Sequence, residues 1–305
     1  MPSWQGKSKG NKLGYSIFIA ILRYGGVYPA YFLLRFVAAY YFLFSWSSSR
    51  PIYKYFHTKA GFSRFKSILN LYRNYYVFGQ TILDKVVVMA GMANKFTFDF
   101  DGEQHLRDMV SGGKGGILLS AHLGNWEVAG HLFKRLQARI NIVMFDGEHE
   151  RIKEYLSSVT GERSVNIIVL KDDLSHIYAI NDALSNQELV CMHADRFLPG
   201  NKTMTADLLG SPAQFPLGPF LLASTFRVPL AAVFAFKESA THYHFYATEP
   251  RVYNGRRQQE QALKDFVGEM EVKIRKYPTQ WFNYYDFWED EGVTVTGSDS
   301  LVSQQ

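Results

Sequence analysis

Residues 115–127 read Gly-Gly-Ile-Leu-Leu-Ser-Ala-His-Leu-Gly-Asn-Trp-Glu, and this stretch decides the fold. Its continuous apolar run, Gly116 to Ser120, predicts a strand that is buried on both faces. Gly124 permits a tight turn after that strand, and Asn125 can cap a helix that follows the turn. The stretch therefore predicts a strand, a turn and a helix, the unit from which α/β sheets are built.

Runs of the same kind recur along the chain and are separated by helix-length segments. They are Ile140 to Phe145, Val165 to Leu170, Leu189 to His193 and Pro229 to Phe236. Phe96 to Phe100 and His242 to Ala247 alternate like strands with one exposed face, and Gln259 to Lys276 has the spacing of a helix. The pattern predicts an α/β fold with a largely parallel mixed sheet flanked by helices.

Charge divides the chain unevenly. Residues 1–83 hold eleven Lys or Arg and no Asp or Glu, together with 22 of the 48 aromatic residues. Basic side chains attract nucleic acid or anionic lipid headgroups, but dense aromatic and aliphatic residues among them favour a bilayer interface. We therefore expect membrane lipids, and no nucleic acid, as partners of this segment.

Two apolar stretches, Leu13 to Leu22 and Val27 to Trp46, are separated by glycines and a proline. The second has the length of a membrane span but contains Arg35, so transmembrane and interfacial helices both stay open. We expect residues 1–50 to form a hydrophobic helical anchor, residues 51–288 an α/β domain, and residues 289–305 a polar tail. The single cysteine, Cys191, cannot form an internal disulfide, which favours a reducing, cytoplasm-facing location.

His122 and Glu127 lie on either side of the predicted turn, so their side chains can come within hydrogen-bonding reach. A carboxylate on one imidazole nitrogen fixes the tautomer and leaves the other nitrogen free to take a proton. A hydroxyl group activated in this way can attack a thioester. We therefore predict that His122 and Glu127 form a catalytic dyad.

The run from His122 to Glu127 resembles the His-x-x-x-x-acid motif of the lysophospholipid acyltransferase superfamily. Its Gly-Asn-Trp-Glu version is most similar to the late acyltransferases of lipid A biosynthesis, and the resemblance covers residues 10–290. It implies a glycerolipid acyltransferase-like fold behind a membrane anchor, on the cytoplasmic face of a bacterial inner membrane. It also implies that His122 is the general base, that Glu127 orients it, and that acyl carrier protein or coenzyme A donates the acyl group as a thioester, without a further cofactor.

Three further segments are similar to the family. The run from His193 to Arg196 follows a predicted strand where the family has an Asp near the active site, with Arg196 in place of the more usual Gln. Residues 208–218 resemble a Phe-Gly-x-x-Ala segment, and residues 278–281 resemble a C-terminal Pro-x-Gln-Trp. From these positions we expect substrate to be bound by Gly124, Asn125, Trp126, Asp195 and Arg196.

The acceptor stays open between two classes. The lipid A enzymes follow their last motif with a His- and Arg-rich sequence, whereas residues 283–288 carry an acid and no base. A lipid A precursor is therefore one candidate, and an aminolipid or a polyene pigment is the other. A lipid-acyl hydrolase and a non-enzymatic lipid-binding protein are alternatives, but the chain lacks a Gly-x-Ser-x-Gly elbow, which favours transfer over hydrolysis.

Metal binding is the rival interpretation of the motif. His131 lies four residues after Glu127, so His122, Glu127 and His131 could act as ligands. The His-Glu-x-x-His pattern of zinc hydrolases is absent, and we predict no metal. Asp195 and Arg196 could instead form a structural ion pair at a strand end.

Overall fold

The computed structural model describes residues 12–89, 96–129, 135–136, 138–145, 165–171, 173, 175–197 and 200–288. The described helices before the sheet are α1 (Lys12–Gly25), α2 (Val27–Phe44), α3 (Trp46–Lys54), a π-helical turn (Tyr55–Lys59) and α4 (Arg64–Met89). The later helices are α5 (Glu103–Ser111), α8 (Ser175–Ser185), α9 (Gly218–Phe226) and α10 (Arg256–Lys276). The described elements also include two 3₁₀ turns, η3 (Trp126–Ala129) and η5 (Pro278–Gln280).

The main sheet has the order β1-β9-β8-β2-β5-β3-β4, with β10 paired to β8. Its strands are β1 (Thr97–Asp101), β2 (Gly116–Ser120), β3 (Ile140–Phe145), β4 (Val165–Leu170), β5 (Leu189–His193), β8 (Pro229–Lys237), β9 (His242–Ala247) and β10 (Arg251–Val252). Strands β8, β2, β5, β3 and β4 run parallel, whereas β9 and β10 are antiparallel to β8. The predicted mixed, largely parallel sheet is confirmed.

Strand β2 lies inside the sheet, between β8 and β5. All five of its residues are buried, as expected for a strand with apolar layers on both faces. Ser120, its last residue, is opposite His193, the last residue of β5. The chain segments that leave these two parallel strands therefore emerge side by side at one edge of the sheet.

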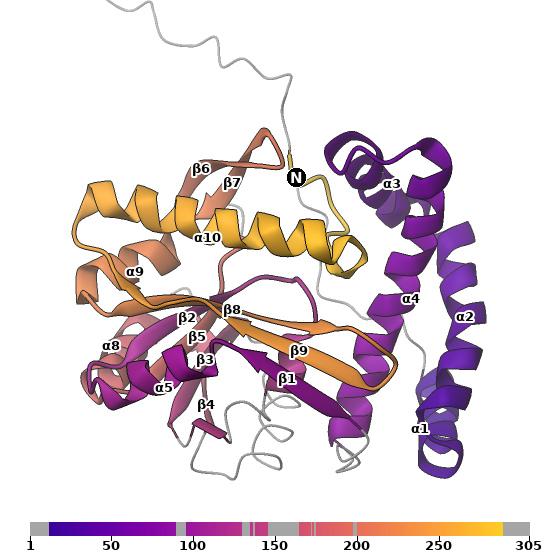
Figure 1. Cartoon of the computed structure of the whole chain (residues 1–305), viewed down its shortest axis with the longest axis horizontal. Coiled ribbons are helices and arrows are strands. Elements are labelled where there is room, and N and C mark those ends of the chain that lie inside the picture. Colours follow the sequence, from indigo (N-terminus) through magenta and orange to yellow (C-terminus); the bar gives the residue numbers. More distant parts are fainter. Residues whose placement is uncertain are drawn as a thin grey trace, which may run out of the picture.

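Helices cover both faces of the sheet (Figure 1). One buried apolar cluster joins α8, α9 and α10 to one face, and Phe220, Phe266 and Met270 are among its fully covered members. A second cluster joins α1, α2 and α5 to the other face, through residues such as Leu106 and Leu118. Burial of this much apolar area supplies most of the driving force for the fold.

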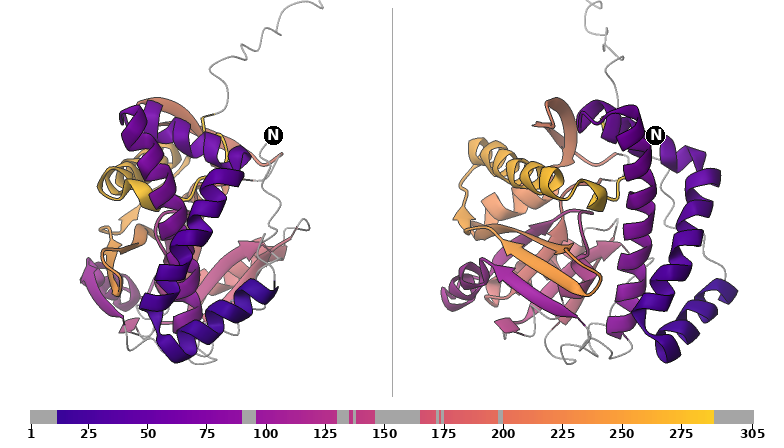
Figure 2. Two further views of the ribbon diagram at one scale, coloured as in Figure 1. Left: turned by 90° about the vertical axis from the view of Figure 1, so that its right-hand side faces the viewer. Right: turned by 45° about the vertical axis from the view of Figure 1, so that its right-hand side comes forward.

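The N-terminal helices form a layer at one end of the sheet, where α2 packs along α4 (Figure 2). Val27, Ala30, Leu34 and Ala38 are buried at three- and four-residue spacing, so they form the inner face of α2. Among the described helices, α2 alone is long and apolar enough to cross a membrane, with a mean hydropathy of 1.4. The expected boundary after residue 50 stays a prediction.

Two features differ from the expectations. Residues 203–216 form an antiparallel hairpin, β6 (Thr203–Leu208) and β7 (Ser211–Pro216), outside the main sheet. The hairpin turns at Leu209 and Gly210, both with positive φ, and the sequence analysis did not predict its strands. The described part of the helix predicted after His122 is a 3₁₀ turn, Trp126–Ala129.

Candidate active site

The predicted catalytic turn leaves the carboxyl end of β2, where open α/β sheets bind their ligands. Gly124 has φ of +77°, a conformation that L-residues rarely adopt. A Cβ atom at this position would lie 2.0 Å from the Ala235 carbonyl oxygen. Glycine is therefore required here both for the backbone conformation and for close packing against β8.

Backbone hydrogen bonds hold the turn on two sides. The Asn125 N–H donates to the Ala235 carbonyl at 2.7 Å, and the Gly124 N–H donates to the Gln280 carbonyl at 2.8 Å. The Phe282 N–H in turn donates to the His122 carbonyl at 3.0 Å. The C-terminal Pro-Thr-Gln-Trp segment, singled out in the sequence, thus fixes the backbone of the predicted catalytic turn.

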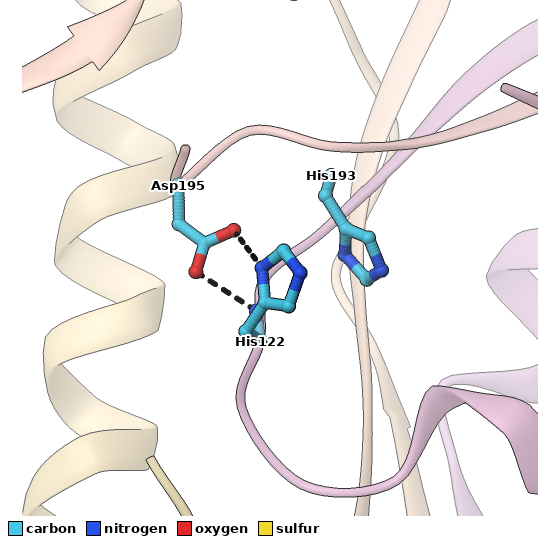
Figure 3. Close-up of side chains that lie close together, drawn as sticks. All are labelled: His122, His193 and Asp195. Carbon is cyan, nitrogen blue, oxygen red and sulfur yellow. Dashed lines mark hydrogen bonds and ion pairs between the residues drawn. The ribbon is translucent and has the colours of Figure 1, made fainter. Parts of the chain in front are cut away.

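Asp195 meets His122 through both of its carboxylate oxygens (Figure 3). Oδ1 lies 2.9 Å from His122 Nδ1, and Oδ2 accepts the His122 backbone N–H at 2.9 Å. Because an ionised carboxylate only accepts, Nδ1 is the donor, and the lone pair of the neutral imidazole lies on Nε2. The pairing follows from strand order, since β2 and β5 are neighbours and the two residues come two positions after their paired ends.

Asp195 stays ionised although it is almost fully buried. Burial by itself raises the pKa of the carboxyl, but His122 and Arg196 outweigh burial and lower the pKa below its usual value. The His122 side chain is 31 % exposed, whereas that of Asp195 is 2 % exposed. The carboxylate is therefore sealed behind an imidazole that can still be reached from outside.

Glu127, the predicted partner of His122, has its backbone in η3, but its side chain lies outside the described residues. The His122–Glu127 dyad therefore stays a prediction. His131, the third member of the rival metal set, also lies outside the described residues.

The five expected substrate-binding residues all lie near this edge, and most of them contact protein groups. The Asn125 side-chain amide donates to the Tyr243 hydroxyl at 3.1 Å and to the Thr81 carbonyl at 3.4 Å. These bonds lead away from η3, so they are not the helix cap that the sequence suggested. Arg196 Nη2 donates to the Phe282 carbonyl at 2.7 Å. Their role in binding substrate stays a prediction.

His193 is the site residue that the sequence analysis did not single out. Its ring centroid lies 4.5 Å from that of His122 and 5.4 Å from that of Trp126. Burial, together with the nearby His122, lowers its pKa to about 3, so the imidazole is neutral at physiological pH. The sequence feature that could have identified His193 is its place as the last residue of an apolar run. The last side chain of a buried strand lies at the ligand-binding edge of the sheet.

An apolar cavity of about 60 Å³ lies beside His193. Trp126 and His193 line it together with Leu118, Ile142, Val233 and Phe245. Cys191 also lines it, and burial raises the pKa of the thiol to about 12, so this cysteine is not a thiolate nucleophile. The cavity therefore offers an apolar surface beside His193, whose ring contacts that of His122.

His122, His193 and Asp195 place three possible metal-ligand atoms within 4.8 Å of one another, among the described residues. His122 Nδ1 and Asp195 Oδ1, however, already share a hydrogen bond of 2.9 Å. This geometry is that of a carboxylate orienting an imidazole, and it leaves only two nitrogens to face an ion. The absence of metal and cofactor stays a prediction.

The fold and the site define an α/β protein whose ionisable side chains gather at the carboxyl ends of its central parallel strands, as they do in enzymes of this architecture. Comparison with known families makes the class specific. The sequence model of the bacterial lipid A biosynthesis acyltransferases matches residues 71–288, and the chain belongs to this family. It is therefore an acyltransferase. A comparison with curated proteins gave no match.

Proposed function

We propose that this protein transfers a fatty acyl chain from a thioester to a hydroxyl group of a membrane lipid, with His122 as the general base. The observation that carries the proposal is the Asp195–His122 hydrogen bond, which directs the free lone pair of the imidazole to Nε2. The donor is an acyl carrier protein or coenzyme A thioester. The acceptor is a lipid A precursor, in keeping with the family.

One imidazole can carry out both proton transfers of the reaction. His122 Nε2 takes the proton of the acceptor hydroxyl while its oxygen attacks the thioester carbonyl carbon. The tetrahedral intermediate then breaks the C–S bond, and His122 returns the proton to the leaving thiolate. Asp195 stabilises the imidazolium that forms between these steps, and Glu127 stays the predicted dyad partner of His122.

The apolar cavity supports a fatty acyl group as the portion transferred. Its walls are almost wholly hydrocarbon and aromatic, and His193, whose ring centroid lies 4.5 Å from that of His122, is one of the lining residues. A chain seated there would place its thioester carbonyl near His122, because the chain and the carbonyl are directly bonded.

The outer face of α2 supports a membrane location. Tyr28, Phe32, Phe36 and Tyr40 lie at four-residue spacing along this face, and each is more than half exposed. Since the inner face packs along α4, which bears charged residues such as Arg73, we place α2 in the bilayer interface, parallel to the surface. Residues 1–83 carry basic and no acidic side chains, so they would be attracted to an anionic cytoplasmic leaflet.

The test is turnover of an acyl thioester in vesicles that contain bacterial membrane lipids. His122→Ala and Glu127→Ala are expected to lower the rate by about 10² to 10⁴ while the protein still folds and binds the vesicles. His105→Ala, on α5, is the matched histidine control and should keep the parent rate. Retained transfer in both site variants would contradict the dyad.

The products distinguish the remaining functions. A new acylated lipid with release of thiol supports transfer, and its mass identifies the acceptor as a lipid A precursor, an aminolipid or a pigment. Free fatty acid as the main product would instead establish a hydrolase. No turnover with retained vesicle binding would leave a lipid-binding protein.

A further inference from the structure

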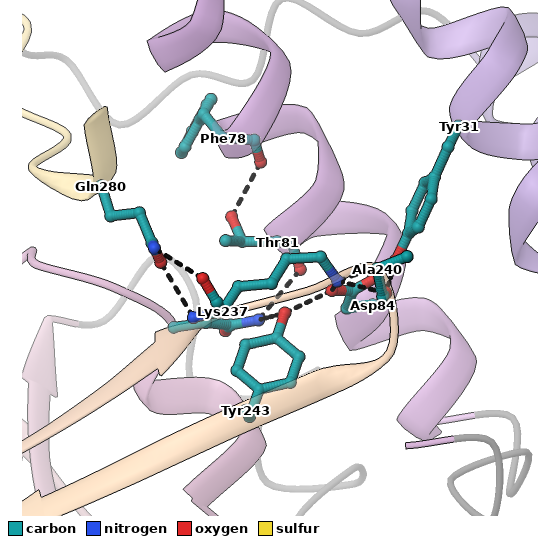
Figure 4. Close-up of polar contacts among 9 residues, drawn as sticks. Tyr31, Phe78, Thr81, Asp84, Lys237, Ala240, Tyr243 and Gln280 are labelled. Carbon is teal, nitrogen blue, oxygen red and sulfur yellow. Dashed lines mark hydrogen bonds and ion pairs between the residues drawn. The ribbon is translucent and has the colours of Figure 1, made fainter. Parts of the chain in front are cut away.

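A sealed polar network connects α2 to the predicted catalytic turn (Figure 4). At its centre, Asp84 of α4 and Lys237 of β8 form an ion pair whose side chains are 0 % and 4 % exposed. The hydroxyl groups of Tyr31, from α2, and Tyr243, from β9, both donate to the Asp84 carboxylate. Two N-terminal helices and two strands of the main sheet thus meet at one carboxylate.

The donors of the network are fully used. Lys237 Nζ donates to Asp84, to the Tyr31 hydroxyl at 3.0 Å and to the Ala240 carbonyl at 2.7 Å. An ammonium group has three protons, so none of them is left without an acceptor. A buried ammonium group with all three hydrogen bonds made favours a single arrangement of the surrounding elements. Any shift of these elements would leave a charged group unpaired in an apolar interior.

The network reaches the turn by two routes. Through the first, the Tyr243 hydroxyl accepts the hydrogen bond from the Asn125 side chain, three residues after His122. Through the second, the Lys237 backbone exchanges two hydrogen bonds of 3.0 and 2.8 Å with the Gln280 side-chain amide. Gln280 is also the residue whose carbonyl accepts the Gly124 N–H. Both routes end on the backbone that carries the imidazole.

Stability alone gives little reason to keep such a network. Buried ion pairs can often be replaced by apolar residues of similar volume without loss of stability, because desolvation offsets the attraction. Tyr31 is one of the buried residues on α2, beside Val27, Ala30 and Leu34, and its hydroxyl joins the inner face of the helix to the ion pair. The opposite face of the same helix is the aromatic surface that we place in the bilayer.

We propose that Tyr31 is a positioning residue that couples the seating of α2 at the lipid interface to the geometry of the catalytic turn. Loss of its hydroxyl removes one donor from Asp84 and lets Tyr243, and with it Asn125, change position. His122 is then held less well against the thioester. The inference rests on the proposed function, since it needs His122 to be the base and α2 to face lipid.

Tyr31→Phe tests the coupling with the smallest possible change. We expect kcat to fall about tenfold, the size that corresponds to losing a hydrogen bond to a charged group, with the KM for the acyl thioester within about twofold. Tyr76→Phe is the matched control, because the Tyr76 hydroxyl joins α4 to the same residue of α2, at the Tyr31 carbonyl, 3.3 Å away. It should keep the parent kcat.

A second readout separates positioning from a loss of fold. The rate in anionic vesicles is divided by the rate in neutral detergent micelles for each variant at equal folded fraction. The parent and Tyr76→Phe are expected to share one ratio, whereas Tyr31→Phe should show a smaller one because its turn no longer responds to the seating of α2. A merely structural defect would lower both rates equally and leave the ratio unchanged, which would overturn the coupling.

A third measurement does not depend on turnover. In protein labelled at histidine, the His122 imidazole resonance, assigned with His122→Asn, should shift in Tyr31→Phe and in Tyr243→Phe but not in Tyr76→Phe. An unchanged resonance in both network variants would exclude the coupling even if one of them were unstable. Full activity of His122→Asn would instead refute the proposed function, so the two failures are distinguishable.

Discussion

Two buried carboxylates, Asp195 and Asp84, hold opposite ends of the same turn in different ways. Asp195 contacts His122 directly, and that imidazole is 31 % exposed. Asp84 reaches Asn125 only through Tyr243, and its cation, Lys237, is sealed from solvent. A carboxylate beside a reachable imidazole can assist proton transfer, whereas one inside a closed ion pair can only hold the elements around it.

The difference is also electrostatic. For Asp195, the charges of His122 and Arg196 outweigh burial, so the pKa of the carboxyl is lowered. For the sealed pair, burial dominates, raising the pKa of Asp84 and lowering that of Lys237. Burial is common to both sites, and the outcome depends on whether the charges and hydrogen bonds of the partners outweigh it. A variant that neutralises Asp195 should therefore lose activity, whereas a variant that neutralises Asp84 should lose stability.

The largest effect is expected at Asp195. Asp195→Asn keeps the shape of the side chain but removes the charge that fixes the His122 tautomer and stabilises its protonated form. We expect kcat to fall about a thousandfold, roughly 4 kcal/mol in the activation barrier, with a smaller change in the free energy of unfolding. Steady-state kinetics and denaturant titration of the same preparation check both quantities.

Asp195→Glu provides the control for that experiment, because it restores the charge with a longer side chain and should recover part of the rate. A variant Asp195→Asn with near-parent kcat would show that another acid orients His122. Glu127, five residues after His122 in the sequence, would then be the one to examine.

The second effect is expected at Asp84 and concerns folding. Asp84→Asn leaves the Lys237 ammonium buried without its counter-ion, which should lower the free energy of unfolding by about 3 kcal/mol. The double variant Asp84→Leu/Lys237→Met removes both charges and should recover most of that loss. Denaturant titration measures each value. A single variant as stable as the parent would mean that water reaches Lys237 and that the pair is not sealed.

The sequence was informative about one of these carboxylates and not about the other. Asp195 follows a continuous apolar run, so its place at a strand end could be predicted, and a family resemblance directed attention to it. Its contact with His122 required the strand order, because only the neighbouring positions of β2 and β5 bring residues 122 and 195 together. Asp84 lies in the interior of α4, where nothing local distinguishes it from a surface acid.

The predicted strands and the unpredicted ones differ in the length of their apolar runs. Strands β2, β3, β4 and β5 are formed by short apolar runs, interrupted only by Asn141 in β3 and Asn166 in β4, and their predicted bounds match the structure. The β6–β7 hairpin alternates small, polar and apolar residues without a long run, and it contains two prolines in β7. Its strands pair with each other rather than with the main sheet, so the periodicity of the sheet gave no signal for them.

The smallest effect is expected at His193, and it concerns how the free energy of unfolding depends on pH. The pKa of His193 is about 3 in the folded protein, against about 6.5 in an unfolded chain. Between these values the unfolded chain binds a proton that the folded protein does not bind, so stability decreases as the pH falls. The slope is at most about 1.4 kcal/mol per pH unit. Asp195 adds little above about pH 5, because its carboxyl is ionised in both states there.

Denaturant titration at pH 7, 6 and 5 isolates the His193 contribution. His193→Gln removes the titrating group and should flatten the decrease relative to the parent, while kcat at neutral pH reports separately on its contact with His122. Equal slopes in parent and variant would mean that the folded protein admits a protonated His193. That outcome would place a cationic imidazole beside His122, within the electrostatic reach of Asp195.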